Sequence, residues 1–389
     1  MSGLIPGRNG WFLIVLGAGV LYDVLASIAL RHWLRDPAPR CTDPIVPITF
    51  FRPLKRGVPR LREKLEALVA SSLAGDQILF GVDPDTEEEA LCAEVQRAFP
   101  QRDIAVVRCA PGAAVNPKIS KVVQMEAPAR HAAWLLSDSE VIFDPEFVDA
   151  FRREWQAEAG AALTAAYRFA NTVSGPQCCD ALAVLLGLWP GLALVRRFGD
   201  VKFTLGACTL VRRDGLAEVG GWRAFGDMLA EDHQLGAALA KAGQRIRLSR
   251  QIATLDSDAM SWTDYWRHQR RVAVTYRAAS PVGFAGMVIT QGLVWCLVAC
   301  LIWPPESSVL IVFSGAVLIR TWRLQGMAGA LKFHFPWPWI WMGLPPSSVM
   351  ETVCWVLSWL SSRVWWSGRW WRVGIRGALS PVPSRFKVP

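Results

Sequence analysis

The sequence predicts an α/β protein with a mainly parallel sheet and with membrane-spanning helices at both ends. Three observations support this. Apolar strands alternate with amphipathic helices between residues 45 and 136, and long uncharged runs lie near both ends of the chain. The composition is 52% hydrophobic and only 19% charged over 389 residues. Such a chain is too apolar for a purely soluble protein and too charged to lie wholly in a bilayer.

An N-terminal anchor is expected within residues 1–40. Residues 11–30 are apolar apart from Asp23, and this run is long enough to cross a bilayer. Arg8 is the only basic residue before it, whereas arginines follow it closely, so residue 31 onward should be cytoplasmic. A cleaved signal peptide is the alternative, but no small-residue cleavage site precedes the charges.

The soluble domain, residues 41–280, should begin with alternating strands and helices. Strands are expected at 45–50, 77–82, 104–109 and 134–136, and helices at 60–72 and 86–99. Thr86 is the expected N-cap of the second helix, because acidic residues fill the turn that follows it. Strand–helix–strand repeats favour parallel pairing with right-handed crossovers.

The second half of this domain is less regular. Strands are expected at 161–167 and 209–211, and a tight turn at 220–222. A helix should start near residue 228 and end at Gly243, with a further strand after it.

Residues 281–389 should form C-terminal transmembrane and interfacial helices with a basic, cytoplasmic tail. Residues 282–303 carry no formal charge and are expected to span the membrane, and 307–319 form a second, shorter span. The next apolar block, 333–362, is rich in Trp and interrupted by prolines. It predicts a helix lying along the membrane near 337–341, followed by a re-entrant stretch.

Several classes of protein are disfavoured. The nine cysteines form no C-x-x-C pair, so neither a zinc site nor a disulfide framework is indicated. No G-x-G-x-x-G follows a strand and no P-loop is present. The net charge is +9, but the arginines gather beside the apolar runs and in the tail. This placement indicates membrane topology and anionic headgroups, with no nucleic acid as partner.

Acidic residues occur at three places in the soluble domain: Asp83 with Asp85, Asp138 with Glu140, and Glu231 with Asp232. The first two pairs follow strands of one parallel sheet, so they should meet at the same edge. Two carboxylates separated by one residue can hold a divalent cation, which in turn holds a diphosphate. A third carboxylate can take the proton from an incoming hydroxyl. Each pair alone is also explained as a helix cap, but the combination favours binding of a nucleotide diphosphate.

The chain resembles the ceramide glucosyltransferase family in the order of its motifs: Asp85, Val115-Asn116-Pro117-Lys118, Asp138-Ser139, Gly206-Ala207-Cys208 with Arg212-Arg213, and Glu231-Asp232. The resemblance spans most of the chain and is strongest from residue 116 to residue 271. It implies a GT-A fold and inverting transfer of a sugar from a UDP-sugar donor.

The resemblance also implies roles for single residues. Asp85, or Asp83 in its place, matches the aspartate that binds the uridine nucleotide. Asp138 matches the aspartate that binds diphosphate and metal, and Glu140 stands where related transferases carry the last acid of D-x-D. Asp232 matches the general base.

Basic residues and histidines complete the expected site. Arg271 matches the arginine of the family's (Q/R)-x-x-R-W motif, which helps to hold the donor diphosphate, although His268 and Val272 replace its first and last residues. Asn116 and Lys118 are expected at the donor, and Glu231, His233 and His268 at the acceptor or in secondary positions. Alternatively, Lys118 is a solvated lysine in a loop, and Arg271 is a basic residue of the kind expected next to a membrane helix. The two histidines then have only local hydrogen-bond partners.

The sequence therefore favours a multi-pass membrane glycosyltransferase that transfers a sugar, glucose above all, to a lipid hydroxyl, with Mn²⁺ or Mg²⁺ as cofactor. Ceramide is the acceptor that the resemblance implies. A hopanoid or a polyprenyl phosphate is an alternative acceptor. A non-catalytic membrane protein that binds nucleotide sugars is an alternative of another class.

Overall fold

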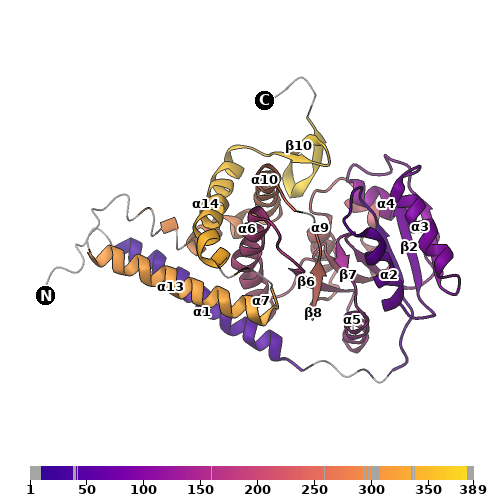
Figure 1. The fold of residues 1–389 in the computed structure, drawn as a ribbon, viewed down its shortest axis with the longest axis horizontal. Coiled ribbons are helices and arrows are strands. Elements are labelled where there is room, and N and C mark those ends of the chain that lie inside the picture. Colours follow the sequence, from indigo (N-terminus) through magenta and orange to yellow (C-terminus); the bar gives the residue numbers. More distant parts are fainter. Residues whose placement is uncertain are drawn as a thin grey trace. The chain divides into compact units, whose positions relative to one another are not determined.

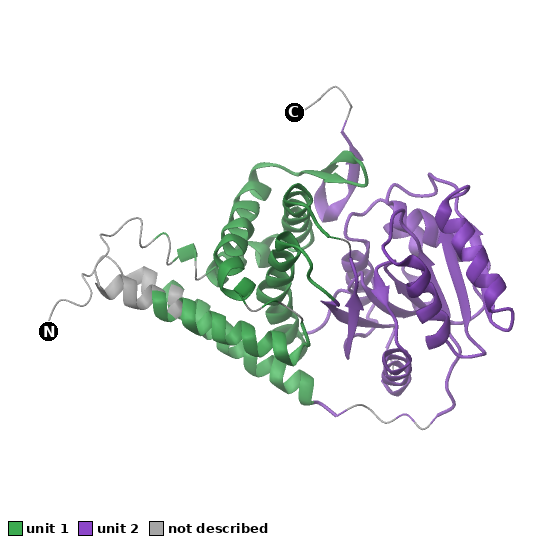
Figure 2. Cartoon of the chain, viewed as in Figure 1, with its two compact units in different colours: residues 1–35, 171–199, 259–373 green, residues 36–170, 200–258, 374–389 purple. Residues whose placement is uncertain are grey.

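The computed structural model describes residues 10–37, 41, 43–158, 160–257, 259–291, 294–295, 298, 307–333, 336 and 338–382. It divides into two compact units, which Figure 2 shows in different colours. Unit 1 contains residues 1–35, 171–199 and 259–373, and unit 2 contains residues 36–170, 200–258 and 374–389. The expected boundaries at residues 40 and 280 follow chain order, whereas the two units interleave along the chain.

Unit 2 is built on an eight-stranded sheet with the order β3-β2-β1-β4-β7-β6-β8-β5. The strands are β1 Thr49–Pro53, β2 Gln77–Val82, β3 Asp103–Arg108, β4 Ala133–Ser137, β5 Val141–Ile142, β6 Ala162–Phe169, β7 Cys208–Arg212 and β8 Ile246–Leu255. β1 to β4 pair in parallel, as β6 and β8 do, whereas β7 is antiparallel to both of its neighbours. β5 pairs antiparallel with β8. The predicted α/β class with a mostly parallel sheet is therefore confirmed.

The helices of unit 2 are α2 Leu61–Ser71, α3 Glu87–Ala98, α4 Pro117–Met125, α5 Pro145–Ala157, α8 Arg213–Glu218, the 3₁₀ turn η2 Trp222–Phe225 and α9 Glu231–Lys241. Three of them, α3, α4 and α5, begin at side-chain caps that the sequence makes recognisable. The hydroxyl of Thr86 accepts a hydrogen bond from the Glu89 amide, which confirms Thr86 as the cap of α3. Asn116 and Asp144 cap α4 and α5 in the same way. The short elements η4 Ile375–Gly377 and β11 Leu379–Pro381 complete the unit.

The first strand lies four residues later than predicted. The sequence favoured 45–50, but β1 runs from Thr49 to Pro53. The reason is the pair of prolines at 44 and 47, which cannot donate to a strand ladder and therefore delay pairing. This shift places Arg52 inside the strand.

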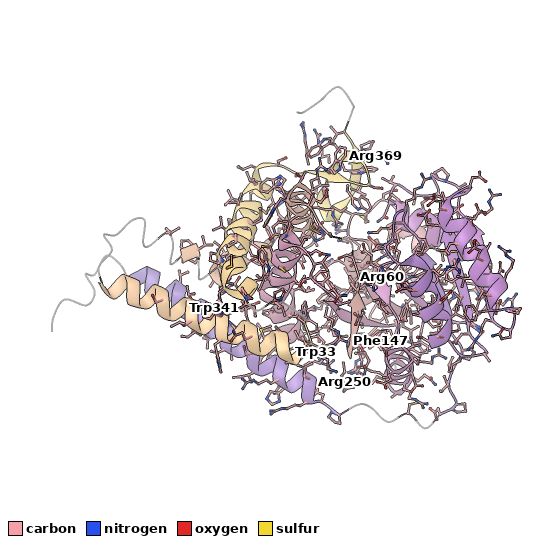
Figure 3. The ribbon with its side chains drawn as sticks, in the orientation of Figure 1. Trp33, Arg60, Phe147, Arg250, Trp341 and Arg369 are labelled. Atoms are coloured by element: carbon pink, nitrogen blue, oxygen red, sulfur yellow. The ribbon has the colours of Figure 1, made fainter. Side chains whose placement is uncertain are left out.

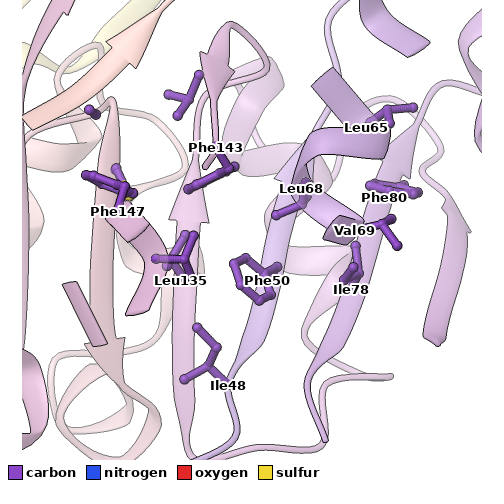
Figure 4. Close-up of a cluster of buried hydrophobic side chains, with 14 of the residues drawn as sticks. Ile48, Phe50, Leu65, Leu68, Val69, Ile78, Phe80, Leu135, Phe143 and Phe147 are labelled. Atoms are coloured by element: carbon purple, nitrogen blue, oxygen red, sulfur yellow. The ribbon is translucent and has the colours of Figure 1, made fainter. Parts of the chain in front are cut away.

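Side chains from the two faces of the sheet form separate apolar clusters. Phe50 belongs to one cluster and Phe51 to the other, because neighbouring residues of a strand point to opposite faces. Figure 4 shows the first cluster, where Phe50 and Leu135 meet Leu68 of α2. Burying each such side chain stabilises the fold by about 1.5–3 kcal/mol. Two buried faces explain why these strands are apolar throughout.

Unit 1 is mainly helical. It contains α1 Gly10–Arg35, α6 Gly175–Ala183, the π-helical turn η1 Val184–Leu188, α7 Trp189–Phe198, α10 Trp262–Ala279, α11 Pro281–Gly286, η3 Met287–Thr290, α13 Ser307–Ala330, α14 Pro338–Leu360 and the hairpin strands β9 Arg363–Trp366 and β10 Arg369–Val373. Figure 1 shows α6, α10 and α14 packed side by side. In Figure 3, Arg369 marks the hairpin and Trp33 marks the end of α1.

Within the described residues, one helical stretch is long and apolar enough to cross a membrane, namely Gly175–Phe198. No membrane span was predicted at this stretch. The expected span 11–30 lies in α1 and the span 307–319 begins α13. The first part of the expected span 282–303 forms the short helix α11 and the 3₁₀ turn η3, and residues 292–293, 296–297 and 299–303 lie outside the described residues. The N-terminal and C-terminal spans therefore stay predictions.

The expected interruption of the last apolar block by prolines is wrong for its second half. α14 continues through Pro345 and Pro346 to Leu360. A proline removes one helix hydrogen bond, but neighbouring helices can supply the lost stability. α14 packs against α6 and α10, and the Ser347 hydroxyl donates to the Cys179 carbonyl on α6 over 3.1 Å.

Candidate active site

Asn116 joins α4 to the segment that leads into α9. Its Oδ1 caps α4 by accepting from the amides of Lys118 at 2.9 Å and Ile119 at 3.4 Å. Its Nδ2 donates to the Met228 carbonyl at 2.9 Å and to Oε2 of Glu231 at 3.1 Å. Asn116 is fully buried, so its loss would leave polar groups without partners. The structure thus gives the first residue of the Asn-Pro-Lys triplet a positioning role.

Lys118 brings three segments of unit 2 together. Its Nζ lies 2.7 Å from Oδ1 of Asp138 at the end of β4 and 3.1 Å from Oε1 of Glu231 at the start of α9. It also donates to the Gly206 carbonyl over 3.2 Å. Burial alone would lower the pKa of Lys118, but the carboxylates of Asp138 and Glu231 raise it above its ordinary value. Lys118 is therefore a fixed cation and not a solvated loop lysine.

Asp232 lies at the beginning of α9, beside this cation. Its Oδ1 accepts from the His233 amide at 2.8 Å, and its carbonyl accepts from the Thr204 hydroxyl at 2.7 Å. Removal from water, together with the Glu231 carboxylate, raises the pKa of Asp232 to about 7. The Lys118 ammonium acts in the opposite direction. A carboxyl group with a pKa near 7 is suited to accept a proton at neutral pH.

Two glycines let the backbone lie close to Asp232. A Cβ atom on Gly206 would stand 3.0 Å from Oδ2 of Asp232 and 3.7 Å from Nζ of Lys118. A Cβ atom on Gly236 in α9 would overlap the backbone of Phe203 and Thr204. The first part of α9 therefore rests directly on residues 203–206.

Arg52 holds the loop that carries Asp138 and was not predicted as part of the site. The fully buried guanidinium donates to Oγ of Ser137 at 3.0 Å and to the carbonyls of Asp138, Ser139 (3.0 Å) and Val141 (2.6 Å). Burial lowers the pKa of Arg52 to about 10, which leaves it charged at neutral pH. The signal in the sequence is a lone charge inside the apolar strand β1.

The two acids of the expected metal pair have different partners. Asp138 pairs with Lys118, whereas Glu140 pairs with Lys55. About a third of the Asp138 side chain, 34%, is exposed and therefore open to a ligand. Across the described ranges, no group of three or more His, Cys, Asp or Glu side chains is arranged to hold a metal. The metal role of Asp138 and Glu140 stays a prediction.

The structure separates the two candidates for the first aspartate. Asp83 lies 3.1 Å from Nζ of Lys121 on α4 and 3.5 Å from Nε of Arg56. Asp85 is 88% exposed and pairs with Arg108 at 2.6 Å. Asp83 is therefore linked through Lys121 to α4, the helix that also carries Lys118, whereas the side chain of Asp85 faces solvent.

The expected secondary residues of α9 have local roles. The ring of His233 stacks on Phe203, with centroids 6.1 Å apart and planes inclined by 5°. Burial lowers the pKa of His233, so this histidine is neutral at pH 7. Both oxygens of Glu231 have partners, one in Asn116 and one in Lys118.

Arg271 and His268 belong to α10 in unit 1. Arg271 Nη2 lies 2.9 Å from Nδ1 of His268, and Nε2 of His268 lies 3.5 Å from Oδ1 of Asp180. Asp180 is buried and accepts from Nε2 of Gln269 at 2.8 Å. His268 thus connects Arg271 to a buried carboxylate that was not predicted as part of the site. The donor-binding role of Arg271 stays a prediction.

Comparison with known proteins identifies the family of the chain. The family model described as Glycosyl transferase family 21 matches residues 11–379. Ceramide glucosyltransferase 1 of Caenorhabditis elegans is 24% identical over 283 residues, which are 67% of this chain and 57% of that protein. The alignment thus spans little more than half of the relative's length.

A solved structure shares the fold. It is the mannosyltransferase PcManGT from Pyrobaculum calidifontis in complex with GDP-Man and Mn²⁺, at a TM-score of 0.52 and 16% identity. The match covers 90% of this chain and 96% of the mannosyltransferase chain. The family match covers nearly the whole sequence, and the mostly parallel sheet is the fold shared with this glycosyltransferase structure. The chain therefore belongs to glycosyl transferase family 21, the ceramide glucosyltransferase family.

Proposed function

We propose that this glycosyltransferase transfers glucose from UDP-glucose to the hydroxyl of a membrane lipid, ceramide, with inversion at the sugar carbon. The observation that carries the proposal is the carboxyl group of Asp232, whose pKa is raised to about 7 beside the Lys118–Asp138 pair. A base and a cation next to each other meet the two needs of a direct displacement, which are removal of a proton and stabilisation of a leaving anion.

In the proposed reaction, Asp232 accepts the proton of the acceptor hydroxyl. The acceptor oxygen forms a bond to C1 of the sugar while the bond from C1 to the diphosphate oxygen breaks. The electron pair of that bond leaves with the nucleotide diphosphate. General-base catalysis of this kind contributes about 10²- to 10⁴-fold to the rate. No residue of the enzyme forms a covalent bond to the sugar, so a single displacement inverts the sugar carbon.

The donor is proposed to bind at the carboxyl ends of the parallel strands. Asp83 at the end of β2 is the better candidate for the uridine nucleotide, since Asp85 faces solvent in a pair with Arg108. Asn116 positions Lys118, and the Lys118 ammonium offers a positive charge to the diphosphate. Arg271 is retained as a donor-binding residue on the resemblance alone.

A divalent cation is proposed to bind at this edge, in exchange for the lysines that now pair with Asp138 and Glu140. Mg²⁺ and Mn²⁺ are commonly held by one or two carboxylates together with substrate phosphates. Asp138 would supply an oxygen ligand, because a third of its side chain is exposed, and Glu140 would supply a second. The bound ion would neutralise charge on the departing diphosphate. The fold relative from Pyrobaculum calidifontis was solved with Mn²⁺.

The lipid acceptor and the membrane setting rest on two supports. A relative of the chain is named for glucosylation of ceramide. The chain also carries a helical stretch, Gly175–Phe198, with the length and apolar character of a membrane span. Ceramide lies in the bilayer, so an enzyme acting on it gains from a membrane location with its catalytic unit facing the cytoplasm.

The test is turnover of UDP-sugars by purified protein in lipid, with Mn²⁺ or Mg²⁺, followed by mass spectrometry of the lipids. Ceramide, a hopanoid and a polyprenyl phosphate should be offered in parallel. Glucosylated ceramide is the expected product. A glycosylated hopanoid or polyprenyl phosphate would replace ceramide as the acceptor. Binding of UDP-sugar without transfer to any lipid would contradict the proposal.

A further inference from the structure

A solvent-open cavity of about 390 Å³ lies in unit 1, where α14 ends and the β9–β10 hairpin begins. Its walls come from six residues: Leu360, Ser361, Ser362, Arg363, Arg372 and Val373. Arg363 and Arg372 are directly opposite each other in the antiparallel hairpin. Like charges in this position repel each other, and an anion between the two guanidinium groups would offset that repulsion.

Two further arginines approach the same point from α10. Nη2 of Arg277 donates to the Ser362 hydroxyl at 2.7 Å, and Nη2 of Arg270 lies 3.5 Å from the Ser361 carbonyl. Among the described residues, Nη1 of Arg270 and Nε of Arg277 are buried without a hydrogen-bond partner. Partial burial lowers the pKa of both arginines, and the charge of Arg277 lowers the pKa of Arg270 further.

An apolar surface adjoins the arginines. Trp359 and Leu360 end α14, and their exposed fractions are 42% and 76%. The guanidinium of Arg277 lies over the Trp359 ring at 5.8 Å. Exposed tryptophan and leucine next to arginine are typical of the layer between lipid headgroups and acyl chains. Figure 1 shows α10, α14 and the hairpin strand β10 close together.

We propose that this cavity binds the phosphate of an anionic membrane phospholipid, with the acyl chains lying along Trp359 and Leu360. The arginine fork matches phosphate oxygens in two parallel hydrogen bonds, which a lysine does not reproduce. The apolar surface is the reason for choosing a lipid over free phosphate. This site does not depend on the proposed sugar transfer, since none of its residues is assigned to donor or base.

Native mass spectrometry of the full chain in detergent tests the proposal, with dioleoylphosphatidylglycerol as the probe. The double substitution Arg363→Gln with Arg372→Gln should weaken binding of this lipid by about tenfold or more, since each lost bond joins charged groups. The matched control is Arg31→Gln with Arg35→Gln, which removes the same charge from the exposed end of α1. The control should bind the lipid like the wild type.

Two comparison ligands separate lipid from free phosphate. Dioleoylglycerol lacks the phosphate and should not bind, and inorganic phosphate at the same concentration should bind far more weakly than the lipid. Unchanged lipid affinity in the double variant would overturn the proposal, and so would equal binding of dioleoylglycerol or preference for inorganic phosphate. If the double variant does not fold, Arg277→Gln decides. A severalfold loss supports the site and unchanged affinity refutes it.

Discussion

The Nζ atom of Lys118 lies 2.7 Å from Oδ1 of Asp138, so one ammonium group joins the start of α4 to the end of β4. The same atom reaches Glu231 at 3.1 Å and thereby fixes the start of α9. Asp232 therefore stands between a cation that lowers its pKa and a carboxylate that raises it. Its protonation depends on both neighbours.

Removal of the Lys118 charge should impair transfer and change its pH dependence. In the wild type, kcat/KM should rise with pH through about 7, because Asp232 must be ionised to act as a base. Lys118→Met removes the cation that lowers the pKa of Asp232, so the rise should shift to higher pH. We also expect kcat/KM to fall by about 10²-fold or more. The measurement is kcat/KM from pH 5 to 9.

The matched control for Lys118 is Lys241→Met. Lys241 is an exposed lysine in the last turn of α9, so its loss should leave the pH profile unchanged. A Lys118→Met profile that rises at the wild-type pH would contradict the electrostatic link between Lys118 and Asp232.

Asp232→Asn should change the pH dependence of stability. The pKa of Asp232 is raised from 3.8 to about 7 in the folded protein, so the folded state binds the proton more tightly than the unfolded state. This contribution to stability is present below pH 3.8 and is lost as pH rises through about 7. The asparagine side chain does not ionise, so the variant does not lose this stability at high pH. Its Tm at pH 8 should therefore exceed that of the wild type by a few degrees. At pH 5 the gain should be far smaller, and an equal gain at both values would argue against the raised pKa.

The two aspartates after β2 should differ in donor binding. Asp83→Asn should weaken binding of the UDP-sugar by about tenfold, because Asp83 lies against Lys121 on the helix that carries Lys118. Asp85→Asn serves as the matched control and should bind the donor like the wild type, since Asp85 is paired with Arg108 in solvent. Calorimetric titration with the donor measures both. The reverse order would restore Asp85 as the nucleotide-binding aspartate.

Arg52→Met should destabilise unit 2 by about 3–5 kcal/mol, because it leaves several buried acceptors of the 137–141 loop without a donor. Lys55→Met removes a neighbouring charge from an exposed pair with Glu140 and should cost less than about 1 kcal/mol. Thermal unfolding of the two variants provides the comparison. Similar losses in both would show that Arg52 does not hold the loop.

Local patterns predicted much of the parallel half of the sheet and its helix caps. Thr86 and the strand 77–82 were found because capping and strand burial leave short-range signals in the sequence. Asp138 was placed correctly beyond a buried strand for the same reason.

Other features depend on contacts between distant segments and leave no local signal. Lys55 pairs with Glu140, and Asp180 pairs with His268. The two residues of each pair lie more than eighty positions apart in the sequence. Arg52 was missed because the prolines moved β1 along the chain. The helical stretch 175–198 was not predicted, although it is the one stretch of the described residues that is long and apolar enough to cross a membrane.

The central claim is that Asp232 acts as the base, and the most direct test measures donor binding and sugar transfer in the same Asp232→Asn preparation. The substitution keeps the size of the side chain but removes its ability to accept the proton. We predict donor affinity within about twofold of the wild type and transfer reduced by about 10²-fold or more. Transfer at the wild-type rate, or a parallel loss of donor binding and transfer, would contradict the assignment.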